Sequence, residues 1–176
     1  TTLKDILNTE ICYICVPTPS DYDGACDTSI VQQVIFELDD YAYSGVVAIK
    51  STVTPGTTAS LQDWYIDLDI CFVPEFLRER CAEVDFTEKH YLCVIGTESP
   101  HIYEAVKESH GKYPQKCVRL SPTEAELAKY FNNTFNATLV TFANSFYEIC
   151  GEMGANYKAI KDSMTTMDHI PDKYLD

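Results

Sequence analysis

Residues 45–57 read GVVAIKSTVTPGT, and this stretch decides the fold. Its first half is an apolar, β-branched run without polar alternation, which is typical of a strand covered on both faces of a sheet. Its second half is a loop rich in hydroxyl groups that ends at Pro55 and Gly56, after which a helical pattern begins. A buried strand followed directly by a loop and a helix predicts an α/β unit.

The same order recurs along the first two thirds of the chain. We predict strands at residues 11–16, 45–52, 69–76, 90–96 and 116–121, and helices at roughly 27–43, 56–66 and 100–112. Strands that alternate with helices favour an open, mostly parallel α/β sheet.

The pattern changes at residue 121. The segment SPTE, residues 121–124, has the form of a capping box with proline at the first helical position. It predicts a long helix from about 122 to 150, followed by a shorter helix near 156–165. We therefore place an α/β domain at residues 1–121 and a helical segment at residues 122–176.

The charge balance narrows the classes of partner. Thirteen basic and 27 acidic residues give a formal net charge of −14, which argues against nucleic acid or an anionic membrane surface. No apolar run is long enough to span a bilayer. Half of the eight cysteines lie inside apolar runs, where cysteine behaves as a small hydrophobic residue. We expect reduced thiols, no metal site and a cytoplasmic protein.

Three polar motifs follow three of the predicted strands. They are VPTPS at residues 16–20, KSTVTPGT at 50–57 and PEFLRE at 74–79. Each alone fits an ordinary loop as well as a binding site. In an open parallel sheet, however, ligands bind beyond the carboxyl ends of the strands, and a helix N-terminus after Gly56 can hold an anion or a bound water. Their common position favours a site.

The long helix carries an unusual polar stripe. Lys129 and Asn133 are four residues apart and share a face, and three further asparagines lie in the same helix, at 132, 136 and 144. A solvated stripe on an amphipathic helix is one interpretation. Because asparagine is a poor helix former, we favour the other one, a stripe that is buried or faces a cleft.

With VPTPS, KSTVTPGT, PEFLRE and KYFNN in this order, the chain resembles the UDP-glucose/GDP-mannose dehydrogenase family from about Ile11 to its end. The Lys-x-x-x-Asn pair also occurs in related β-hydroxyacid dehydrogenases. PEFLRE is similar to the UDP-glucose and GDP-mannose branch and unlike the branch that acts on UDP-N-acetylmannosamine.

The resemblance implies a fold and a reaction. Residues 1–121 are expected to be the C-terminal part of a Rossmann-like NAD-binding domain, and 122–176 the start of a central helical domain that forms a homodimer through helix 122–150. The family oxidises the C6 alcohol of a nucleotide sugar to a carboxylate in two hydride transfers to NAD. A cysteine traps the aldehyde, and a thioester is then hydrolysed. UDP-glucose is the substrate we favour. The alternative substrates are GDP-mannose or another nucleotide sugar. The alternative function is that of a non-catalytic dimerisation or binding module.

By the same resemblance, individual residues take roles. Thr52 would hold a catalytic water, Glu75 would act as acid and base in thioester hydrolysis, and Lys129 and Asn133 would stabilise an oxyanion. The cofactor-binding residues implied are Val16, Pro17, Thr18, Pro19, Ser20, Ser51 and Glu79. The substrate-binding residues implied are Phe76, Leu77, Arg78, Glu79, Lys129 and Asn133.

The chain also departs from the family pattern. The Gly-rich dinucleotide loop of the family should precede residue 1, and its Gly-Gly-x-Cys segment should follow Asp176, so neither is among these residues. Arg80 stands where a small residue is usual, and MDHI at 167–170 replaces Asp-x-Arg-Ile. We therefore expect residues 1–176 to be part of a longer protein, or a remnant of one, and to be inactive alone.

Overall fold

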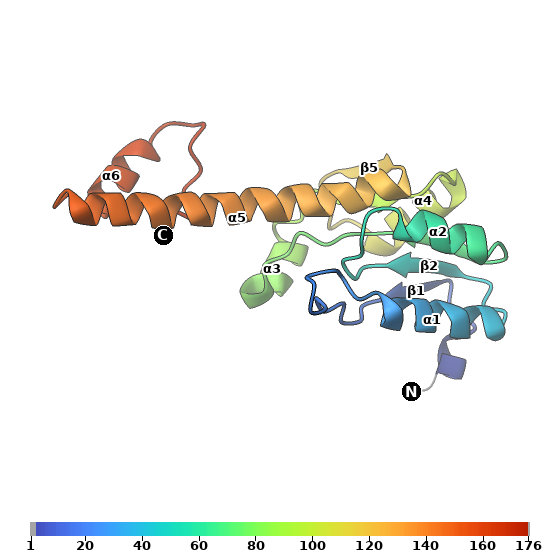
Figure 1. The fold of residues 1–176 in the computed structure, drawn as a ribbon. Coiled ribbons are helices and arrows are strands. Elements are labelled where there is room, and N and C mark those ends of the chain that lie inside the picture. The colour runs from blue at the N-terminus through green and yellow to red at the C-terminus, as the bar shows by residue number, and fades with distance from the viewer. Residues whose placement is uncertain (1–2, 176) are drawn as a thin grey trace. The chain divides into compact units, whose positions relative to one another are not determined.

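The computed structural model describes residues 3–175 and divides them into two compact units. The first unit runs up to Lys129 and the second begins at Tyr130. The helix α5 (Pro122–Glu152) contributes to both units, and each unit is described by itself (Figure 1).

The first unit is built on a five-stranded sheet in the order β1-β2-β3-β4-β5. The strands are β1 (Ile11–Ile14), β2 (Val46–Ile49), β3 (Asp69–Phe72), β4 (Cys93–Gly96) and β5 (Cys117–Leu120). Neighbouring strands are parallel throughout, except that β3 and β4 meet antiparallel at Phe72 and Gly96. The predicted α/β class and mostly parallel sheet are confirmed, and each predicted range contains its strand.

The antiparallel junction was not predicted. Between β3 and β4 lie the 3-10 helix η2 (Glu79–Cys81) and the six-residue helix α3 (Ala82–Thr87). After this segment β4 lies beside β3 in the opposite direction, and the two strands meet through the register pair of Phe72 with Gly96.

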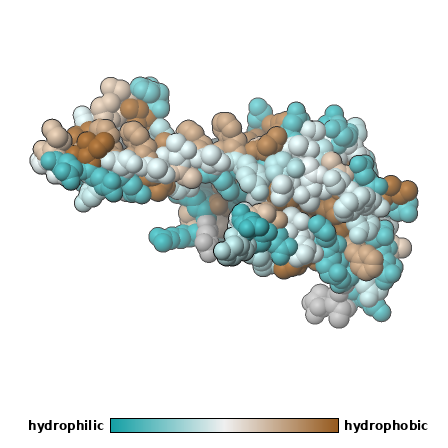
Figure 2. Space-filling model, in the orientation of Figure 1, coloured by the Kyte–Doolittle hydropathy of each residue, from teal (hydrophilic) through white to brown (hydrophobic). Residues whose placement is uncertain are grey.

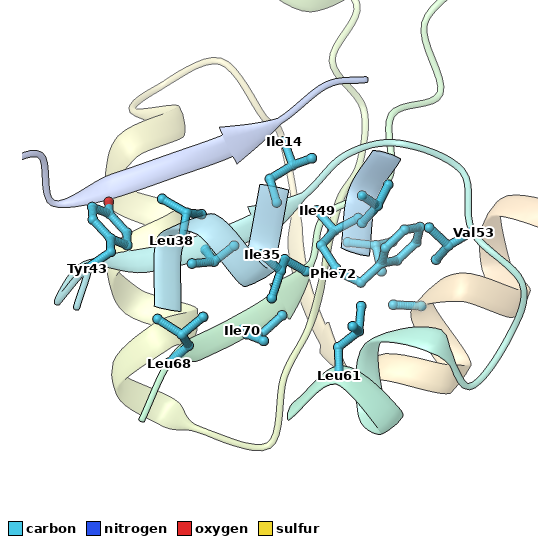
Figure 3. Close-up of a cluster of buried hydrophobic side chains, with 14 residues drawn as sticks. Ile14, Ile35, Leu38, Tyr43, Ile49, Val53, Leu61, Leu68, Ile70 and Phe72 are labelled. Carbon is cyan, nitrogen blue, oxygen red and sulfur yellow. The ribbon is translucent and has the colours of Figure 1, made fainter. Parts of the chain in front are cut away.

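Helices cover the sheet on both faces. The predicted helices appear as α1 (Ser29–Asp40), α2 (Thr57–Trp64) and α4 (Pro100–His110), and a short 3-10 helix η1 (Leu3–Ile6) precedes β1. Figure 3 shows how Ile35 and Leu38 of α1 and Leu61 of α2 meet Ile49 and Phe72 of the sheet.

The alternate residues of the same strands point to the other face of the sheet, where they form a second hydrophobic core with α4. Val46 and Ala48 of β2 and Ile95 of β4 pack with Ile102 and Val106 of α4. Because both faces are covered, β2 and β4 are buried at every position, as the continuous apolar runs in the sequence predicted. Each fully buried Leu, Ile or Val side chain contributes roughly 1.5–3 kcal/mol.

The first turns of α5 lie against the end of β4. A Cβ added to Gly96 would come within 2.6 Å of the Cβ of Ala125, so only glycine permits this approach. The predicted capping box starts the helix: the backbone N–H of Ser121 donates to Glu124 Oε2 at 2.9 Å, and Glu124 N–H donates back to Ser121 Oγ.

The second unit consists of the rest of α5 and the helix α6 (Tyr157–Met164). Gly154, at φ 65°, closes α5 while Ala155 N–H donates to the carbonyl of Cys150, the pattern of a Schellman motif. The Tyr147 and Tyr157 rings meet edge to face at 5.8 Å. Between residues 3 and 175, no helix combines the length and apolarity needed to cross a bilayer.

β1 forms one edge of the sheet within residues 3–175. The carbonyls of Glu10 and Ile14 accept hydrogen bonds from Val46 and Lys50 on the β2 side. Alternate residues of a parallel strand bond to the same neighbour, so the backbone groups of Ile11 and Tyr13 point to the free edge. Such an edge is a template for pairing with another chain.

We predict that the polypeptide 1–176 self-associates through this edge at low micromolar concentration. Ile11→Pro, which removes an outward N–H, should lower the weight-average mass in sedimentation velocity, and the control Ile11→Val should not. The net charge of −14 opposes association, so the mass should rise with salt, because the screening length falls to about 8 Å at physiological ionic strength. A monomer at every salt concentration would contradict this prediction.

Candidate active site

Three motif loops leave the same edge of the sheet. VPTPS follows β1, KSTVTPGT follows β2 and PEFLRE follows β3, and these three strands are parallel. Their carboxyl ends therefore lie side by side, which is where open α/β sheets bind ligands.

Ser51 joins the first two loops. Its side chain is buried, its hydroxyl oxygen accepts from Val16 N–H at 2.8 Å, and the hydroxyl donates to the Val16 carbonyl at 2.7 Å. The Cys26 thiol adds a second link, at 3.5 Å from the Thr52 carbonyl and 4.0 Å from that of Thr18. Ser51 thus acts on the neighbouring loop, in which Pro17, Pro19 and Ser20 are exposed and Thr18 is half-buried.

Two hydroxyl groups stay free on these adjacent loops. Thr18 and Thr52 are each half-buried, and within residues 3–175 neither side-chain oxygen has a hydrogen-bond partner. A half-buried hydroxyl without a protein partner can bind a water or a ligand hydroxyl. The predicted water-holding residue, Thr52, therefore has its hydroxyl available.

The N-terminus of α2 already has its anion. Glu126 of α5 is fully buried, and its carboxylate accepts hydrogen bonds from Gly56 N–H at 2.5 Å, Thr58 N–H at 2.8 Å and the Thr58 hydroxyl at 2.6 Å. The expectation that this helix N-terminus binds a ligand anion or water is wrong, because a side chain of the same chain occupies it. Hydrogen bonds to a charged group contribute roughly 1.5–3 kcal/mol each.

Lys129 holds the third loop. Its side chain is 8% exposed, and its ammonium donates to Glu75 Oε1 at 2.7 Å and to the Glu75 carbonyl at 2.5 Å. An ammonium has three donors, so one N–H remains for a ligand. The Phe76 ring lies beside it, 5.9 Å from nitrogen to ring centroid. Glu75 Oε2 accepts from Leu77 N–H at 2.7 Å, which fixes the carboxylate.

A second lysine adds positive charge near Glu75. Lys50 is half-buried, with its ammonium 5.7 Å from the centroid of the Tyr13 ring. Burial lowers the pKa of Lys50, and the charge of Glu75 opposes that shift while Lys129 adds to it. Lys50 belongs to the KSTVTPGT motif, but we did not predict it as a site residue.

Arg78 is bound to an acidic partner in α3. Its guanidinium donates to both carboxylate oxygens of Asp85, at 2.7 and 2.9 Å, and its backbone N–H donates to the same group at 3.0 Å. Asp85 is buried, and these hydrogen bonds from Arg78 hold the pKa of its carboxyl well below the ordinary value. The pair folds the PEFLRE loop onto α3. Glu79 begins η2, and its side chain lies outside the described part of the chain.

The asparagine stripe is not buried. Asn133 and Asn144 are exposed, and Asn132 and Asn136 are half-buried. Asn133 accepts from the Asn132 side chain at 3.3 Å. The buried alternative is therefore wrong for these four residues, since within the described part of the second unit only the short helix α6 is available to pack on α5. The alternative that the stripe faces a cleft stays a prediction. Burial along the polar face ends at Lys129, the last residue of the first unit.

Three thiols of the sheet are poor nucleophiles. All eight cysteines are free. Burial raises the pKa of Cys71 and of Cys93 to about 12, and it also raises that of Cys12. Because the thiolate is the reactive form, these three residues are expected to stay protonated at neutral pH.

An open hollow lies at the opposite, amino edge of the sheet. Glu10, Asp69, Glu104 and Glu108 are among its lining residues. Four carboxylates repel an anionic ligand such as a nucleotide. Because it lies at the amino edge, the hollow is separate from the candidate site at the carboxyl edge.

Glu126 and Asp85 were missed by sequence reasoning. A signal existed for Glu126, which is three residues before Lys129 and so shares its side of the helix. For Asp85 no local signal was available, since acidic residues are common in short exposed helices.

Comparison with known proteins agrees with the motif order. The model of the UDP-glucose/GDP-mannose dehydrogenase family, NAD binding domain, matches residues 1–113, and that of the central domain matches residues 123–176. The chain belongs to the UDP-glucose/GDP-mannose dehydrogenase family.

Relatives and solved structures of this dehydrogenase family cover nearly the whole chain. UDP-glucose 6-dehydrogenase AglM of Haloferax volcanii is 29% identical over 99% of the chain and 45% of its own length. A UDP-glucose dehydrogenase structure from Pyrobaculum islandicum covers 98% of the chain and 42% of its own, with TM-score 0.87 and 26% identity. A GDP-mannose dehydrogenase structure from Pseudomonas aeruginosa covers 95% and 41%, with TM-score 0.79 and 26% identity. The chain thus spans less than half the length of these relatives.

NAD is the cofactor of the family, and the carboxyl edge of the sheet fits it. Thr18 and Thr52 present free hydroxyls on two adjacent loops, and Ser51 fixes the loop that begins at Val16. A ribose offers hydroxyl groups that such residues can bind.

We predict that Asp85→Asn lowers the melting temperature at pH 7 by several degrees, while Asp63→Asn, at an exposed position in α2, does not. The folded-state pKa of Asp85 is depressed, so its contribution is fully present above the unfolded value of about 3.9. It is lost as pH falls further through the folded value. In pH-dependent thermal melts, the gap between wild type and Asp85→Asn should close below about pH 4. A gap that stays constant with pH would contradict the ionic role of Asp85.

Proposed function

We propose that this chain is part of an NAD-dependent nucleotide-sugar 6-dehydrogenase that oxidises UDP-glucose to UDP-glucuronate. The contact between Lys129 and Glu75, made beside free threonine hydroxyls at the carboxyl edge of the sheet, carries this proposal. The order of the four motifs and the similarity to UDP-glucose dehydrogenases support it. Residues 1–121 would supply the NAD-binding part, and 122–176 the start of the central domain.

Lys129 would stabilise negative charge on the sugar. When the C6 alcohol loses its proton, charge develops on its oxygen, and the remaining N–H of Lys129 can donate to it. A preorganised donor in a water-poor position is worth more than one in bulk solvent. Asn133, one helical turn further along the same face of α5, would donate its amide to the same oxygen. Residues 16–20 and Ser51 would hold NAD, which would supply the hydride acceptor for C6.

Glu75 and Thr52 would act in hydrolysis of the thioester. The Glu75 side chain is 37% exposed, so its carboxylate is accessible to a water molecule and can take the proton that the water loses. The Thr52 hydroxyl would orient that water. The family uses a cysteine in a Gly-Gly-x-Cys context for the thioester, and none of the eight cysteines in residues 1–176 has it.

The other motif residues would contact the cofactor or the sugar, or would position the residues that do. Ser51 would hold residues 16–20 in place along the cofactor, as its two hydrogen bonds to Val16 suggest. Leu77 and Phe76 are half-buried, with the Phe76 ring beside Lys129, and both would line the sugar. Arg78 would complete this wall with its position set by Asp85, and Glu79 follows it at the cofactor side.

We predict that Lys129→Ala lowers kcat by about 10²–10³ and changes the KM for NAD less than about twofold. The measurement is a steady-state assay of the longest polypeptide that carries these residues, well below its melting temperature. Lys107→Ala is the matched control, since Lys107 is an exposed lysine of the first unit paired with Glu104. A loss smaller than about tenfold would assign Lys129 a structural role.

GDP-mannose is the second candidate substrate, favoured by the similarity to the Pseudomonas aeruginosa enzyme. Assaying NADH formation with UDP-glucose and GDP-mannose in parallel separates the two. Absence of NADH with both sugars in the longest polypeptide would favour a non-catalytic binding module and contradict the proposed activity.

We also propose a homodimer through helix 122–150. Within the second unit, exposed apolar side chains follow one another at steps of four, seven and seven residues along α5. They are Phe131, Phe135, Phe142 and Ile149. Steps of this kind place side chains on one face, as in a helix that packs against another helix. Phe131 is 77% exposed, and Figure 2 shows hydrophobic surface in this part of the molecule. A second copy would cover this face.

Phe142→Glu should weaken the dimer at least tenfold in sedimentation equilibrium, because it places a charge in an apolar contact. Asn144→Glu is the matched control, since it adds the same charge at an exposed position of the same helix. Equal dissociation constants for the two variants would remove helix 122–150 from the interface.

We further propose a cytoplasmic location, which the eight free cysteines support.

A further inference from the structure

The buried carboxylate of Glu126 is stabilised by hydrogen-bond donors and not by a cation. Within residues 3–175, no lysine, arginine or histidine nitrogen forms an ion pair with it. Its partners are two backbone N–H groups and one hydroxyl, all at the start of α2. The positive end of that helix stabilises the negative charge.

α2 depends on this side chain for its N-terminal cap. Its own capping residue is Gly56, at φ 95°, which has no side chain to accept a hydrogen bond. The next hydroxyl, that of Thr57, donates to the Thr54 carbonyl, and apart from Glu126 no side chain among residues 3–175 accepts from the first N–H groups of α2. Glu126 therefore replaces from α5 the cap that α2 lacks.

The segment that carries Thr52 is fixed at both ends. Ser51 ties its start to Val16 after β1, and Gly56 ties its end to Glu126. Thr52 lies between the two anchors, and its own hydroxyl stays free. Loss of either anchor would let the segment move relative to the sheet edge.

One turn of α5 connects two loops. Glu126 and Lys129 are three residues apart and lie on the same side of the helix. Glu126 holds the loop after β2, and Lys129 holds Glu75 in the loop after β3. The separation between Thr52 and Glu75 therefore depends on both side chains.

We propose that Glu126 is a positioning residue, which holds the Thr52 segment at a fixed distance from the Lys129 and Glu75 pair through the N-terminus of α2. Its kinetic consequence rests on the proposed dehydrogenase function. Its structural consequence does not. A displacement of about 1 Å in a positioned group can lower a catalytic rate about 10²-fold.

The substitution Glu126→Gln distinguishes the contact with the Gly56 N–H from the contact with the Thr58 N–H. Glu126 Oε1 receives both bonds from Thr58, and Oε2 receives the bond from Gly56. A glutamine can keep its oxygen toward Thr58, and its NH₂ group then faces the Gly56 N–H, where two donors cannot bond. Glu126→Ala removes both contacts. Thr58→Val removes only the hydroxyl bond.

The first test is amide hydrogen exchange on the polypeptide 1–176. In Glu126→Gln we expect the Gly56 amide to exchange at least tenfold faster and that of Thr58 to change little. In Glu126→Ala both should exchange faster. The amides of β1 and β3 should keep their rates. Glu124→Gln is the matched control, since it perturbs the cap of α5 without contacting α2. Unchanged Gly56 exchange, or an equal increase throughout the first unit, would overturn the proposal.

The second test is steady-state kinetics of the longest polypeptide that carries these residues, at least about 15 °C below its melting temperature. Glu126→Gln should lower kcat about tenfold to hundredfold, with the KM for NAD within about twofold, and Glu124→Gln should leave both unchanged. A lower melting temperature with kcat intact would make Glu126 a purely structural residue and overturn the proposal. If the wild type itself has no dehydrogenase activity, the proposed function fails, and the exchange of Gly56 decides the role of Glu126.

Discussion

The burial of one carboxylate constrains the whole candidate site. Glu126 has no exposed surface, and an isolated charge inside a protein costs several kcal/mol. The chain offsets that cost only when Gly56 and Thr58 present their donors to it. The loop after β2, the start of α2 and the start of α5 must therefore adopt their positions together. A helix N-terminus that might have bound a ligand instead fixes the protein's own loops.

The same stretch of α5 sets the chemistry at the sheet edge. Lys129 follows one turn later and binds Glu75, while Arg78 and Asp85 hold the rest of that loop against α3. Polar side chains thus position the loops, and the apolar sheet below supplies the rigid support. Among residues 3–175, unused hydrogen-bonding capacity at this edge includes the third N–H of Lys129 and the hydroxyls of Thr18 and Thr52. Hydrogen-bonding groups without a protein partner, held in position by a rigid scaffold, can bind a substrate.

The sequence predicted the elements better than their contacts. Continuous apolar runs such as VVAI of β2 revealed buried strands, and SPTE revealed the start of α5, because both patterns are local. The antiparallel direction of β4 relative to β3 is a pairing between strands, which periodicity along the chain does not show. The asparagines of α5 were expected to be buried or to face a cleft; they are not buried, because burial depends on what packs against a helix. The role of Glu126 likewise depends on a contact with residues far away in the sequence.

The contact between Gly96 and Ala125 limits how this protein can vary. A side chain at residue 96 would collide with the Ala125 methyl group, and moving α5 outward to make room would carry Glu126 and Lys129 away from both loops. The two smallest side chains in the interface thus set the thickness of the layer between helix and sheet. Across related sequences, a larger residue at either position should appear only with a compensating change at the other. The sequence of this protein is therefore constrained by the missing side chain at residue 96, which faces α5 one helical turn before Lys129.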